Sequence, residues 1–403
     1  MTSEGQGPLK GLKVIELAHI MAGPVCGLML ADMGADVIKV EKVPGGDDSR
    51  RFLPPDIGGE AAAFMMMNRN KRGIAVDLKS EAGRDVVRRL LEGADVVIAN
   101  YRQGTMERFG LGYETLARAN PGLIYCEISG FGRTGPYAER AGFDLIAQGM
   151  SGLMSITGEG PGRPPVKMGA PVTDITAGIL GAMGVAAAYA QRLQSGRGQR
   201  VDTSLFEAGI THTYWQSAIA FATGRPPGPM GSAHPLNAPY QSFPTADGWI
   251  TLGAANQANW ERTTQVIGAP ELADDPRFRD NARRQENLPV LVEELERRFA
   301  ERTSAVWLER LEAAGVPAGP VLDIREVHHD PQTLARDMVV KVAHSRLGQV
   351  ETLGLPVKFS ETPGAVVAGA PLYGEHTREV LAEFGYGEAE IDRLVDAGAV
   401  VAA

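Results

Sequence analysis

The sequence is poor in cysteine and in aromatic residues. Its 403 residues include two cysteines, Cys26 and Cys126, which form neither a CxxC pair nor a metal-ligand spacing. Both lie in apolar runs, so we expect two small buried side chains and no disulfide framework, as in a reducing compartment. Aromatic residues make up only 6% of the chain while glycines number 49, so Ala, Gly, Val and Leu must fill most of the core.

Positive charge and long apolar runs are also scarce. The formal net charge is −9, which argues against a nucleic-acid or membrane-surface binder, because phosphate groups attract clustered positive charge. Residues 1–10 are polar and lack the apolar core of a signal peptide, so we expect a cytoplasmic protein. The Gly- and Ala-rich segment from Ile175 to Ala190 falls short of the roughly 20 residues that cross a bilayer, and we expect a buried helix there.

Three common catalytic signatures are missing from the sequence. The histidines form no HExxH or related pattern, so no metal site is expected, and no GxSxG elbow supports a serine hydrolase. A nicotinamide-binding turn needs GxGxxG after the first strand, but the turn here reads Ala18-His-Ile-Met-Ala-Gly23. Although Glu41 ends the second strand, where such enzymes carry an acidic residue, a dehydrogenase is therefore not supported.

The amino-terminal half alternates between strand and helix patterns. Leu12–Ala18 and Asp36–Glu41 are typical of buried strands, and the helical pattern from Pro24 to Met33 connects them. Such a strand–helix–strand unit implies parallel strands with a right-handed crossover. The alternation continues as far as a helix predicted over Phe206–Thr223. The fold class predicted is α/β, with an open parallel Rossmann-like sheet in a large domain.

A change in composition after residue 223 indicates a second domain. Gly224-Arg-Pro-Pro-Gly-Pro-Met-Gly231 is typical of a linker, and the pattern beyond it is mostly helical with one clear strand, Trp249–Leu252. The predicted division has a large α/β domain, 1–223 and 338–403, a smaller α+β domain, 237–323, and linkers at 224–236 and 324–337.

Asp174 precedes the Gly- and Ala-rich helix and has two interpretations. It is a good helix N-cap, whose carboxylate accepts backbone N–H groups. The same position at the positive end of the helix dipole would keep the carboxylate ionised, so it could also act as a nucleophile. Gly178, Gly181 and Gly184 lie on nearly one face of the helix, where another backbone or a ligand could approach closely.

A short basic run, Asn68-Arg-Asn-Lys-Arg72, also has two interpretations. With Lys42, Arg102 and Arg108 it could form a pocket for phosphates, since guanidinium groups match phosphate oxygens. Alternatively it is a solvated surface.

The motifs, taken in order, resemble those of class III CoA-transferases, a family that includes formyl-CoA:oxalate and carnitine CoA-transferases and the α-methylacyl-CoA racemases. The resemblance covers nearly the whole chain. Its carriers are Leu9-Lys-Gly-Leu-Lys-Val-Ile-Glu-Leu17, Ala22-Gly-Pro24, Gly34-Ala-Asp-Val-Ile-Lys-Val-Glu41, Asn70-Lys-Arg72, Asp144-Leu-Ile-Ala-Gln-Gly-Met-Ser-Gly152, Asp174 and Gly196-Arg-Gly-Gln-Arg-Val-Asp202.

The resemblance implies an enzyme that moves coenzyme A from an acyl-CoA to a free carboxylic acid, such as a small carboxylate or dicarboxylate, without a permanently bound cofactor. It implies an interlocked homodimer, and Asp174 as the nucleophile that forms anhydride and CoA-thioester intermediates. Backbone N–H groups at the helix start would stabilise the oxyanions. The residues at the implied CoA pocket are His19, Ile20, Met21, Ala22, Lys42, Val76, Lys79, Asn100, Tyr101, Arg102, Arg108, Phe143 and Asp144.

The chain departs from the family pattern at three places. Met21 stands where the formyl-CoA enzyme has Gln, so oxalate is not favoured as a substrate. Phe143 stands at or next to the position of a His in the racemases, so a second proton-transfer base is missing and racemisation is the weaker alternative. The segment Gly228–His234, at the place of a glycine-rich lid, has only two glycines. A non-catalytic acyl-CoA-binding protein is the third possibility.

Overall fold

The computed structural model describes residues 7–403, and the chain divides into two compact units. The first contains the residues up to Gly152, Met168–His212 and Pro331–Ala403. The second contains Leu153–Lys167 and Thr213–Asp330, so it includes two segments that the sequence analysis placed in the large domain, 153–167 and 213–223.

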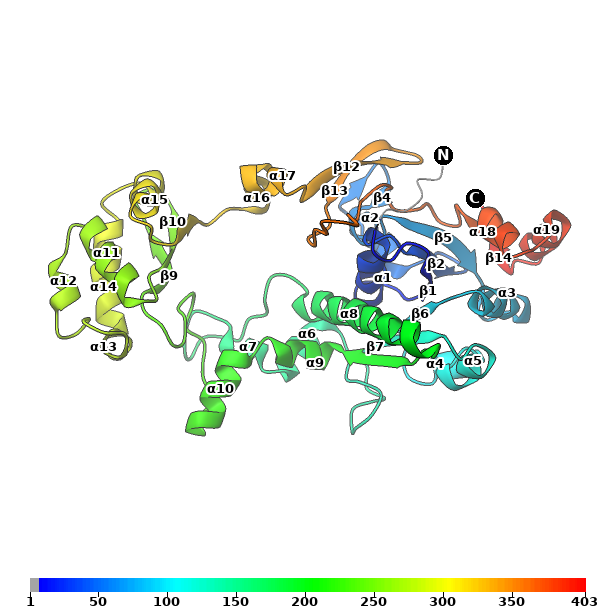
Figure 1. Ribbon diagram of the computed structural model, residues 1–403, viewed down its shortest axis with the longest axis horizontal. Coiled ribbons are helices and arrows are strands. Elements are labelled where there is room, and N and C mark those ends of the chain that lie inside the picture. Colours follow the sequence, from blue (N-terminus) through cyan, green and yellow to red (C-terminus); the bar gives the residue numbers. More distant parts are fainter. Residues whose placement is uncertain (1–6) are drawn as a thin grey trace. The chain divides into compact units, whose positions relative to one another are not determined.

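The first unit is built on a seven-stranded sheet (Figure 1). Its strands run in the order β14-β5-β2-β1-β6-β7-β8. All neighbours pair in parallel except β14, which is antiparallel to β5. Without β14 this is the strand order of a Rossmann fold, as predicted. The strands are β1 (Lys13–Leu17), β2 (Asp36–Lys42), β5 (Lys71–Val76), β6 (Val96–Ala99), β7 (Ile124–Ser129), β8 (Arg200–Ser204) and β14 (Val400–Val401).

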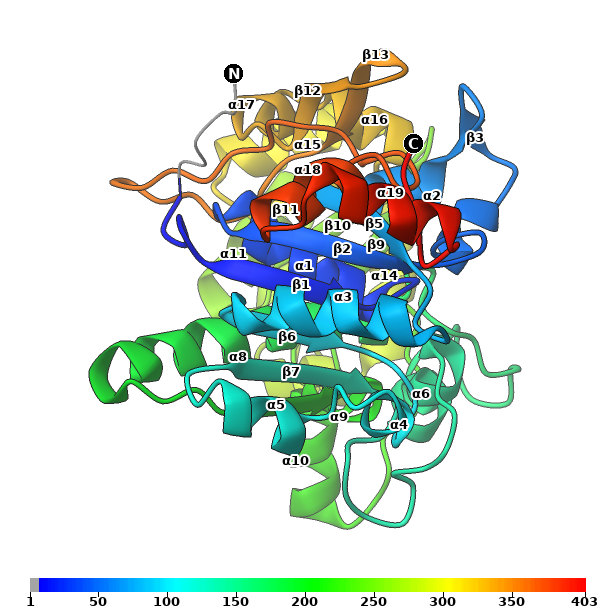
Figure 2. The ribbon, with the colours of Figure 1, turned by 90° about the vertical axis from the view of Figure 1, so that its right-hand side faces the viewer.

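The sheet lies in the core of the first unit because its strands contain hydrophobic residues that helices cover on both faces. All four residues of β6 are buried, as expected of a parallel strand covered on both faces. Figure 2 shows α3, α5, α18 and α19 in front of the sheet and α1 and α8 behind it. Each face has its own hydrophobic cluster, which contains both the strand residues and the helices of that side. Cys26 and Cys126 are both fully buried, as predicted.

The helices of the first unit begin and end close to the predicted residues. Ser80 caps α3, because its side chain accepts the N–H of Gly83. The longer helices are α1 (Ala22–Asp32), α3 (Glu81–Glu92), α5 (Tyr113–Ala119), α6 (Asp144–Met150), α8 (Val172–Ser195), α9 (Leu205–Thr211), α18 (Thr377–Glu383) and α19 (Glu388–Asp396). The shorter ones are η1 (Asp48–Arg51), α2 (Ala62–Met67), α4 (Thr105–Arg108) and α17 (Pro331–Ala335). The predicted helix 206–223 is wrong as one element, since it is divided into α9 and α10 (Tyr214–Thr223).

Helix α8 has 24 residues, and an 18-residue stretch of it has a mean hydropathy of 1.4, so it is long and apolar enough to cross a membrane by length and composition alone. The helix is thus longer than predicted, and the expectation that this segment is too short to span a bilayer was wrong. A core helix of a globular protein has the same properties, and α8 packs against α1 and β7 through Ala177, Gly178 and Gly181. A Cβ on Gly178 would lie 2.7 Å from the Ala22 carbonyl oxygen, so glycine is needed for this close contact.

Two small antiparallel pairs complete the first unit. They are formed by β3 (Asp56–Ile57) with β4 (Glu60–Ala61), and by β12 (Val339–His344) with β13 (Gly348–Leu353). The second unit has a three-stranded antiparallel sheet in the order β11-β10-β9, packed with helices around Trp260, Trp307 and Phe299. Its strands are β9 (Tyr240–Pro244), β10 (Trp249–Gly253) and β11 (Ala318–Pro320). Its helices are α7 (Leu153–Ile156), α10, α11 (Gln257–Val266), α12 (Glu271–Asp274), α13 (Asn281–Glu286), α14 (Leu288–Phe299), α15 (Ser304–Ala313) and α16 (Ile324–His329).

Candidate active site

A cavity of about 460 Å³ lies at the carboxyl edge of the large sheet. The segments that follow β1, β6 and β7 all contribute to its wall, and Asp174 from the first turn of α8 is also part of it. Strands β1 and β6 are the neighbours at which the strand order reverses direction, and ligands of open α/β sheets bind at this point. Position and volume both favour this cavity as the active site.

The turn between β1 and α1 forms one wall of the cavity. The His19 backbone donates to Asn100 Oδ1 (3.0 Å) and its carbonyl accepts from Asn100 Nδ2 (2.8 Å), so the turn is joined to the segment after β6. The His19 ring stacks on the Tyr101 ring, with centroids 5.3 Å apart. Burial lowers the pKa of His19, more than the neighbouring carboxylates raise it, so its ring is neutral near pH 7.

Asp174 is the third residue of α8, and the N-cap is Pro171. The N-cap prediction was thus wrong, because the helix begins three residues earlier than expected. Asp144 holds this helix start: its Oδ1 accepts the backbone N–H of Thr173 at 3.0 Å and the Thr173 hydroxyl at 2.8 Å. The N–H of Val172 donates to Ala170. These two N–H groups already have acceptors. Fewer backbone N–H groups at the helix start are therefore free to bind an oxyanion than the sequence predicted.

The Asp174 carboxyl has an unusual acidity. Burial, followed by the negative charge of Asp144, raises its pKa from 3.8 to about 7. The prediction that the helix dipole keeps this carboxylate ionised therefore does not describe the site below pH 7. A carboxylate with a raised pKa is a more basic nucleophile than an ordinary aspartate, and it remains available in its ionised form near neutral pH.

The basic side chains in and near the cavity wall are of two kinds. Lys42 lies outside the wall and is paired with Asp48, which lines it, with 2.6 Å between Lys42 Nζ and Asp48 Oδ1. Arg102 and Arg140 line the cavity, and among the ion pairs of residues 7–403 neither of them has a partner. The Arg140 guanidinium lies over the Tyr137 ring at 3.9 Å. Arg102 and Arg140 thus provide positive charge for an anionic ligand in the cavity that also contains Asp174.

The structure brings most of the predicted site residues together. Those that line the cavity are His19, Ile20, Met21, Ala22, Asn100, Tyr101, Arg102, Phe143 and Asp174. The others, Lys42, Val76, Lys79, Arg108 and Asp144, are outside its wall. Asp144 is engaged in holding α8, Arg108 donates to Thr105 Oγ1, and the Val76 side chain is fully buried in the sheet. The CoA contacts proposed for these five residues stay predictions.

Sequence reasoning missed several residues of the wall, above all Glu139 and Arg140. They belong to the segment between β7 and α6, which carries Gly130, Gly132 and Gly135. A glycine-rich segment that follows a parallel strand lies at the carboxyl edge, and this was the signal that could have identified them.

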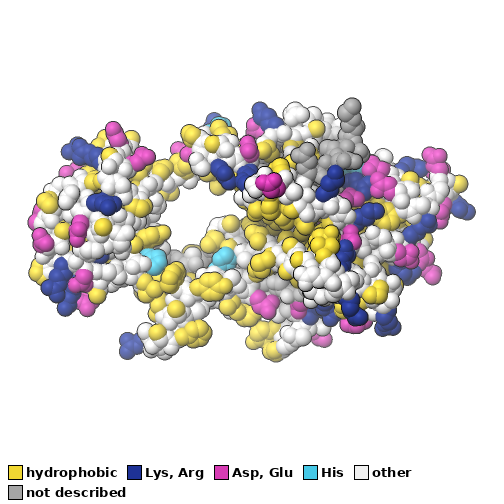
Figure 3. Space-filling view, in the orientation of Figure 1, with side chains coloured by type: hydrophobic (Ala, Val, Ile, Leu, Met, Phe, Trp, Pro, Cys, Tyr) yellow, Lys and Arg dark blue, Asp and Glu magenta, His cyan; other side chains and the backbone are white. Residues whose placement is uncertain are grey.

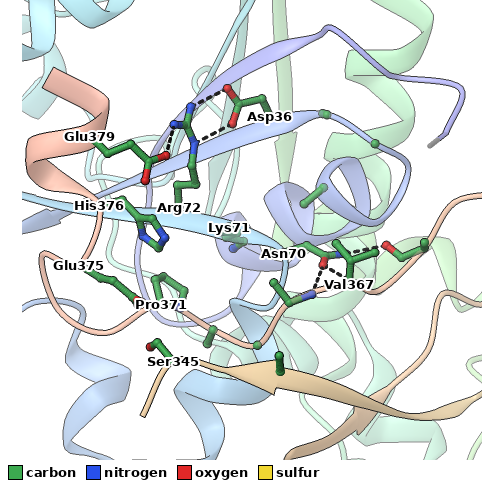
Figure 4. A pocket seen from close by; sticks show the side chains of 18 of the residues that line it. Asp36, Asn70, Lys71, Arg72, Ser345, Val367, Pro371, Glu375, His376 and Glu379 are labelled. Atoms are coloured by element: carbon green, nitrogen blue, oxygen red, sulfur yellow. Dashed lines mark hydrogen bonds and ion pairs between the residues drawn. The ribbon is translucent and has the colours of Figure 1, made fainter. Parts of the chain in front are cut away.

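A larger cavity of about 660 Å³ lies at the opposite, amino edge of the sheet (Figure 4). The charged side chains in it neutralise one another: Arg72 binds Asp36 at 2.8 Å, Glu379 at 3.0 Å and Glu383 at 2.7 Å. Asn70 ties the chain at Val367 to the start of β5. Although larger, this cavity is distant in the fold from Asp174 and is not the candidate site.

This location overturns one interpretation of the basic run. Arg69 is buried against Asp32, with 2.6 Å between Nη2 and Oδ2, and Lys71 is buried against Glu16 at 2.8 Å. The run therefore begins β5 at the amino edge and does not contribute to a phosphate pocket with Lys42, Arg102 and Arg108. Among residues 7–403, no group of His, Cys, Asp and Glu side chains is arranged to hold a metal ion.

Comparison with known proteins agrees with this geometry. The model of CoA-transferase family III matches residues 9–377. The succinate–glutarate CoA-transferase of Agrobacterium fabrum is 42% identical over 93% of this chain and 95% of its own. The acetyl-CoA:oxalate CoA-transferase of Acetobacter aceti is 38% identical over 96% of this chain and 98% of its own.

A solved structure has the same fold. The crystal structure of a CAIB/BAIF family protein from Brucella suis is 42% identical to this chain and superposes with a TM-score of 0.84. The match covers 94% of this chain and all of that protein (100%).

Proposed function

The chain belongs to CoA-transferase family III, and we propose that it transfers coenzyme A between small dicarboxylic acids through covalent intermediates on Asp174. The family match shows that the chain is a CoA-transferase, and so do the two CoA-transferases described above, which match it over almost their whole length. The observation that supports the finer proposal is the cavity whose wall contains Asp174 together with Arg102 and Arg140, two guanidinium groups without carboxylate partners among the described residues.

The ionised Asp174 carboxylate attacks the thioester carbonyl, the C–S bond breaks, and CoA leaves as a thiolate. The product is an anhydride between Asp174 and the donor acid. The thiolate then attacks the Asp174 carbonyl, which releases the donor carboxylate and leaves an aspartyl–CoA thioester. The acceptor carboxylate repeats these steps in reverse and leaves as the new acyl-CoA. The overall reaction exchanges one thioester for another of similar energy, so no ATP is needed, and the low polarity that raises the pKa of Asp174 also keeps water out.

The dicarboxylate preference rests on Arg102 and Arg140. One carboxylate of the substrate reacts at Asp174, and a second carboxylate needs a cation to replace its water shell. An Arg–carboxylate pair can be bidentate, which gives geometric selectivity as well as affinity. The first relative described above acts on succinate and glutarate by its name, which agrees with such a pair.

Two copies of the chain are proposed to form the active enzyme, as the family resemblance implies. Large apolar side chains next to the cavity are exposed on α6 and α8, with Leu145 51%, Ile179 48% and Met183 62% accessible. Figure 3 shows hydrophobic side chains at the surface where α8 lies. A second copy would cover them. Light scattering should give the mass of a dimer, and Met183→Glu should weaken it.

The test of the proposed chemistry is intact-protein mass spectrometry after mixing with succinyl-CoA, followed by peptide mapping. We expect a mass increase equal to CoA less one water on the peptide that contains Asp174, and no increase in Asp174→Ala, which should still bind CoA. An adduct on another residue, or one that persists in Asp174→Ala, would overturn the assignment. The racemase alternative would instead show exchange of an α-proton with heavy water and no adduct.

A further inference from the structure

Ile20, in the wall of the cavity, has a backbone conformation that its residue type avoids. Its φ is +68°, in the left-handed region. A β-branched residue is rarely found there, because its Cβ crowds the backbone, and such strain costs on the order of 1–3 kcal/mol. A strained residue persists only where its surroundings hold it. The conformation of Ile20 directs the chain from His19 to Met21, and all three residues line the cavity that contains Asp174.

The group that holds Ile20 is the Asp47 carboxylate. The backbone N–H of Ile20 donates to both of its oxygens, at 3.0 Å to Oδ1 and 3.2 Å to Oδ2. Asp47 lies in the segment that follows β2, so this contact joins the ends of two neighbouring strands. The other side of the turn is held by the two hydrogen bonds between His19 and Asn100.

Asp47 is itself fixed from several directions. Lys39 Nζ lies 2.8 Å from its Oδ2, and the Ser49 backbone N–H and hydroxyl donate to Oδ1 at 2.9 and 2.7 Å. Lys39 also donates to the Ala18 carbonyl at 2.9 Å, just before the turn. The Lys39 ammonium therefore contacts both Asp47, which holds the turn, and Ala18, the residue just before the turn.

The charges beneath the turn form a closed, neutral group. Lys39 and Lys71 face Glu16 and Asp47, and the exposure of the four side chains is at most 1%. Burial would raise the pKa of Asp47, but Lys39 and the hydrogen bonds outweigh it and hold the pKa well below the usual range. Burial would likewise lower the pKa of Lys39, but Glu16, Asp47 and Glu41 outweigh it and raise it. Both groups are therefore charged throughout the working pH range.

We propose that Asp47, held by Lys39, is a positioning residue of the transfer reaction: it keeps Ile20 in the left-handed conformation and so fixes the wall that presents the acyl-CoA to Asp174. This inference rests on the proposed function of Asp174. Asp47 does not line the cavity, so it acts through the backbone of the turn.

The first test is Asp47→Asn, with Asp32→Asn as a matched control. Asp32 is also a buried carboxylate of the first unit paired with a cation, Arg69, but it is remote from the cavity wall. Asn keeps one acceptor oxygen but loses the second acceptor of the Ile20 N–H and the charge that pairs with Lys39. We expect the single-turnover rate of adduct formation at saturating succinyl-CoA to fall by about 10- to 100-fold in Asp47→Asn, because small misplacements of reacting groups are costly. In Asp32→Asn the rate should stay within about twofold even if both variants lose similar thermal stability.

The second test asks whether the effect passes through Ile20. Glycine adopts positive φ without strain, so Ile20→Gly should no longer need Asp47. In a double-mutant cycle, Asp47→Asn should therefore reduce the rate much less in the Ile20→Gly background than in the native one. Equal losses in both backgrounds would overturn the proposal, because they would mean that Asp47 acts only through stability or charge.

A second variant and a second measurement keep the proposal testable if the first experiment fails. If Asp47→Asn does not fold, Lys39→Met with Asp47→Asn removes the buried pair together and leaves Glu16 balanced by Lys71. The same cycle is also measured on the dissociation constant of CoA by calorimetry. If the native enzyme forms no adduct, the proposed function of Asp174 fails, while coupling between Ile20 and Asp47 in CoA binding still tests the positioning role.

Discussion

The Asp144 carboxylate accepts the backbone N–H of Thr173 at 3.0 Å, and through this contact it holds the turn of helix from which Asp174 projects. The same negative charge adds to burial in raising the pKa of Asp174 to about 7. One residue thus positions the proposed nucleophile and makes it more basic. The cost is that a proton competes with the substrate for Asp174 near neutral pH.

This relationship predicts the pH dependence of the first chemical step. Only the ionised Asp174 attacks, so the single-turnover rate of adduct formation should rise through pH 7 and level off above it. Asp144→Asn keeps an oxygen acceptor for Thr173 but removes the charge, so the midpoint should move to lower pH. Asp85→Asn, which changes an exposed residue of α3, is the control and should leave the midpoint in place. An unchanged midpoint in Asp144→Asn would contradict the electrostatic role.

The raised pKa also predicts a stability cost. Between pH 4 and 7 the folded protein retains a proton on Asp174 that the unfolded chain has lost, so stability falls as pH rises through this range and is lowest above it. Asp174→Asn should therefore be more stable than the native protein at pH 8, by on the order of 1–3 kcal/mol. The difference should disappear near pH 4. Urea titrations at both pH values measure it, and a less stable Asn variant at pH 8 would contradict the prediction.

Arg140 is predicted to select the second carboxylate of the substrate. Arg140→Gln should raise KM for succinate by about tenfold or more, since a charge-assisted pair contributes roughly 1.5–3 kcal/mol. KM for a monocarboxylate of the same length should change little. Arg118→Gln, on the exposed side of α5, is the control. If KM for the acyl-CoA rises instead, Arg140 binds the coenzyme, and the selectivity assignment is wrong.

Gly178 is predicted to be essential for the contact between α8 and α1. In Gly178→Ala the new Cβ would lie 2.7 Å from both the Ala22 carbonyl oxygen and Val25 Cβ. Relief of this clash requires a backbone shift, which should cost about 1–3 kcal/mol in the free energy of unfolding and weaken CoA binding, because Ala22 lines the cavity. Gly228→Ala, which adds a methyl in open space, should change neither.

Much of the fold could be read from local patterns. The strands near Lys13–Leu17 and Asp36–Lys42 are rich in Val and Ile, and the helix between them begins at Ala22-Gly-Pro24, so the parallel unit followed without tertiary information. Asp174 at the start of a glycine-rich helix was identified in the same way. Helix boundaries were less certain: α8 begins at Val172, because Asp144, 28 residues earlier than Val172 in the chain, supplies the acceptor for its first turn.

Charged residues could not be assigned in this way. Lys42 and the run from Asn68 to Arg72 are both basic in the sequence, but Lys42 pairs with Asp48, which lines the cavity, whereas Lys71 is buried beside Glu16 at the start of β5. The partner that neutralises a charge is usually distant in sequence, and only the packed structure brings the two together. Arg140 was missed for the same reason, since nothing local distinguishes an unpaired arginine from a paired one.

The sequence by itself determined the alternation of strands and helices that forms the parallel sheet, the family and the proposed nucleophile, because these depend on apolar periodicity and on motifs of adjacent residues. The tertiary structure decided the acidity of Asp174, the strained turn at Ile20 with its support by Asp47 and Lys39, and the choice between two cavities. These properties depend on burial and on distances between charges, which arise only when segments remote in the chain pack against one another.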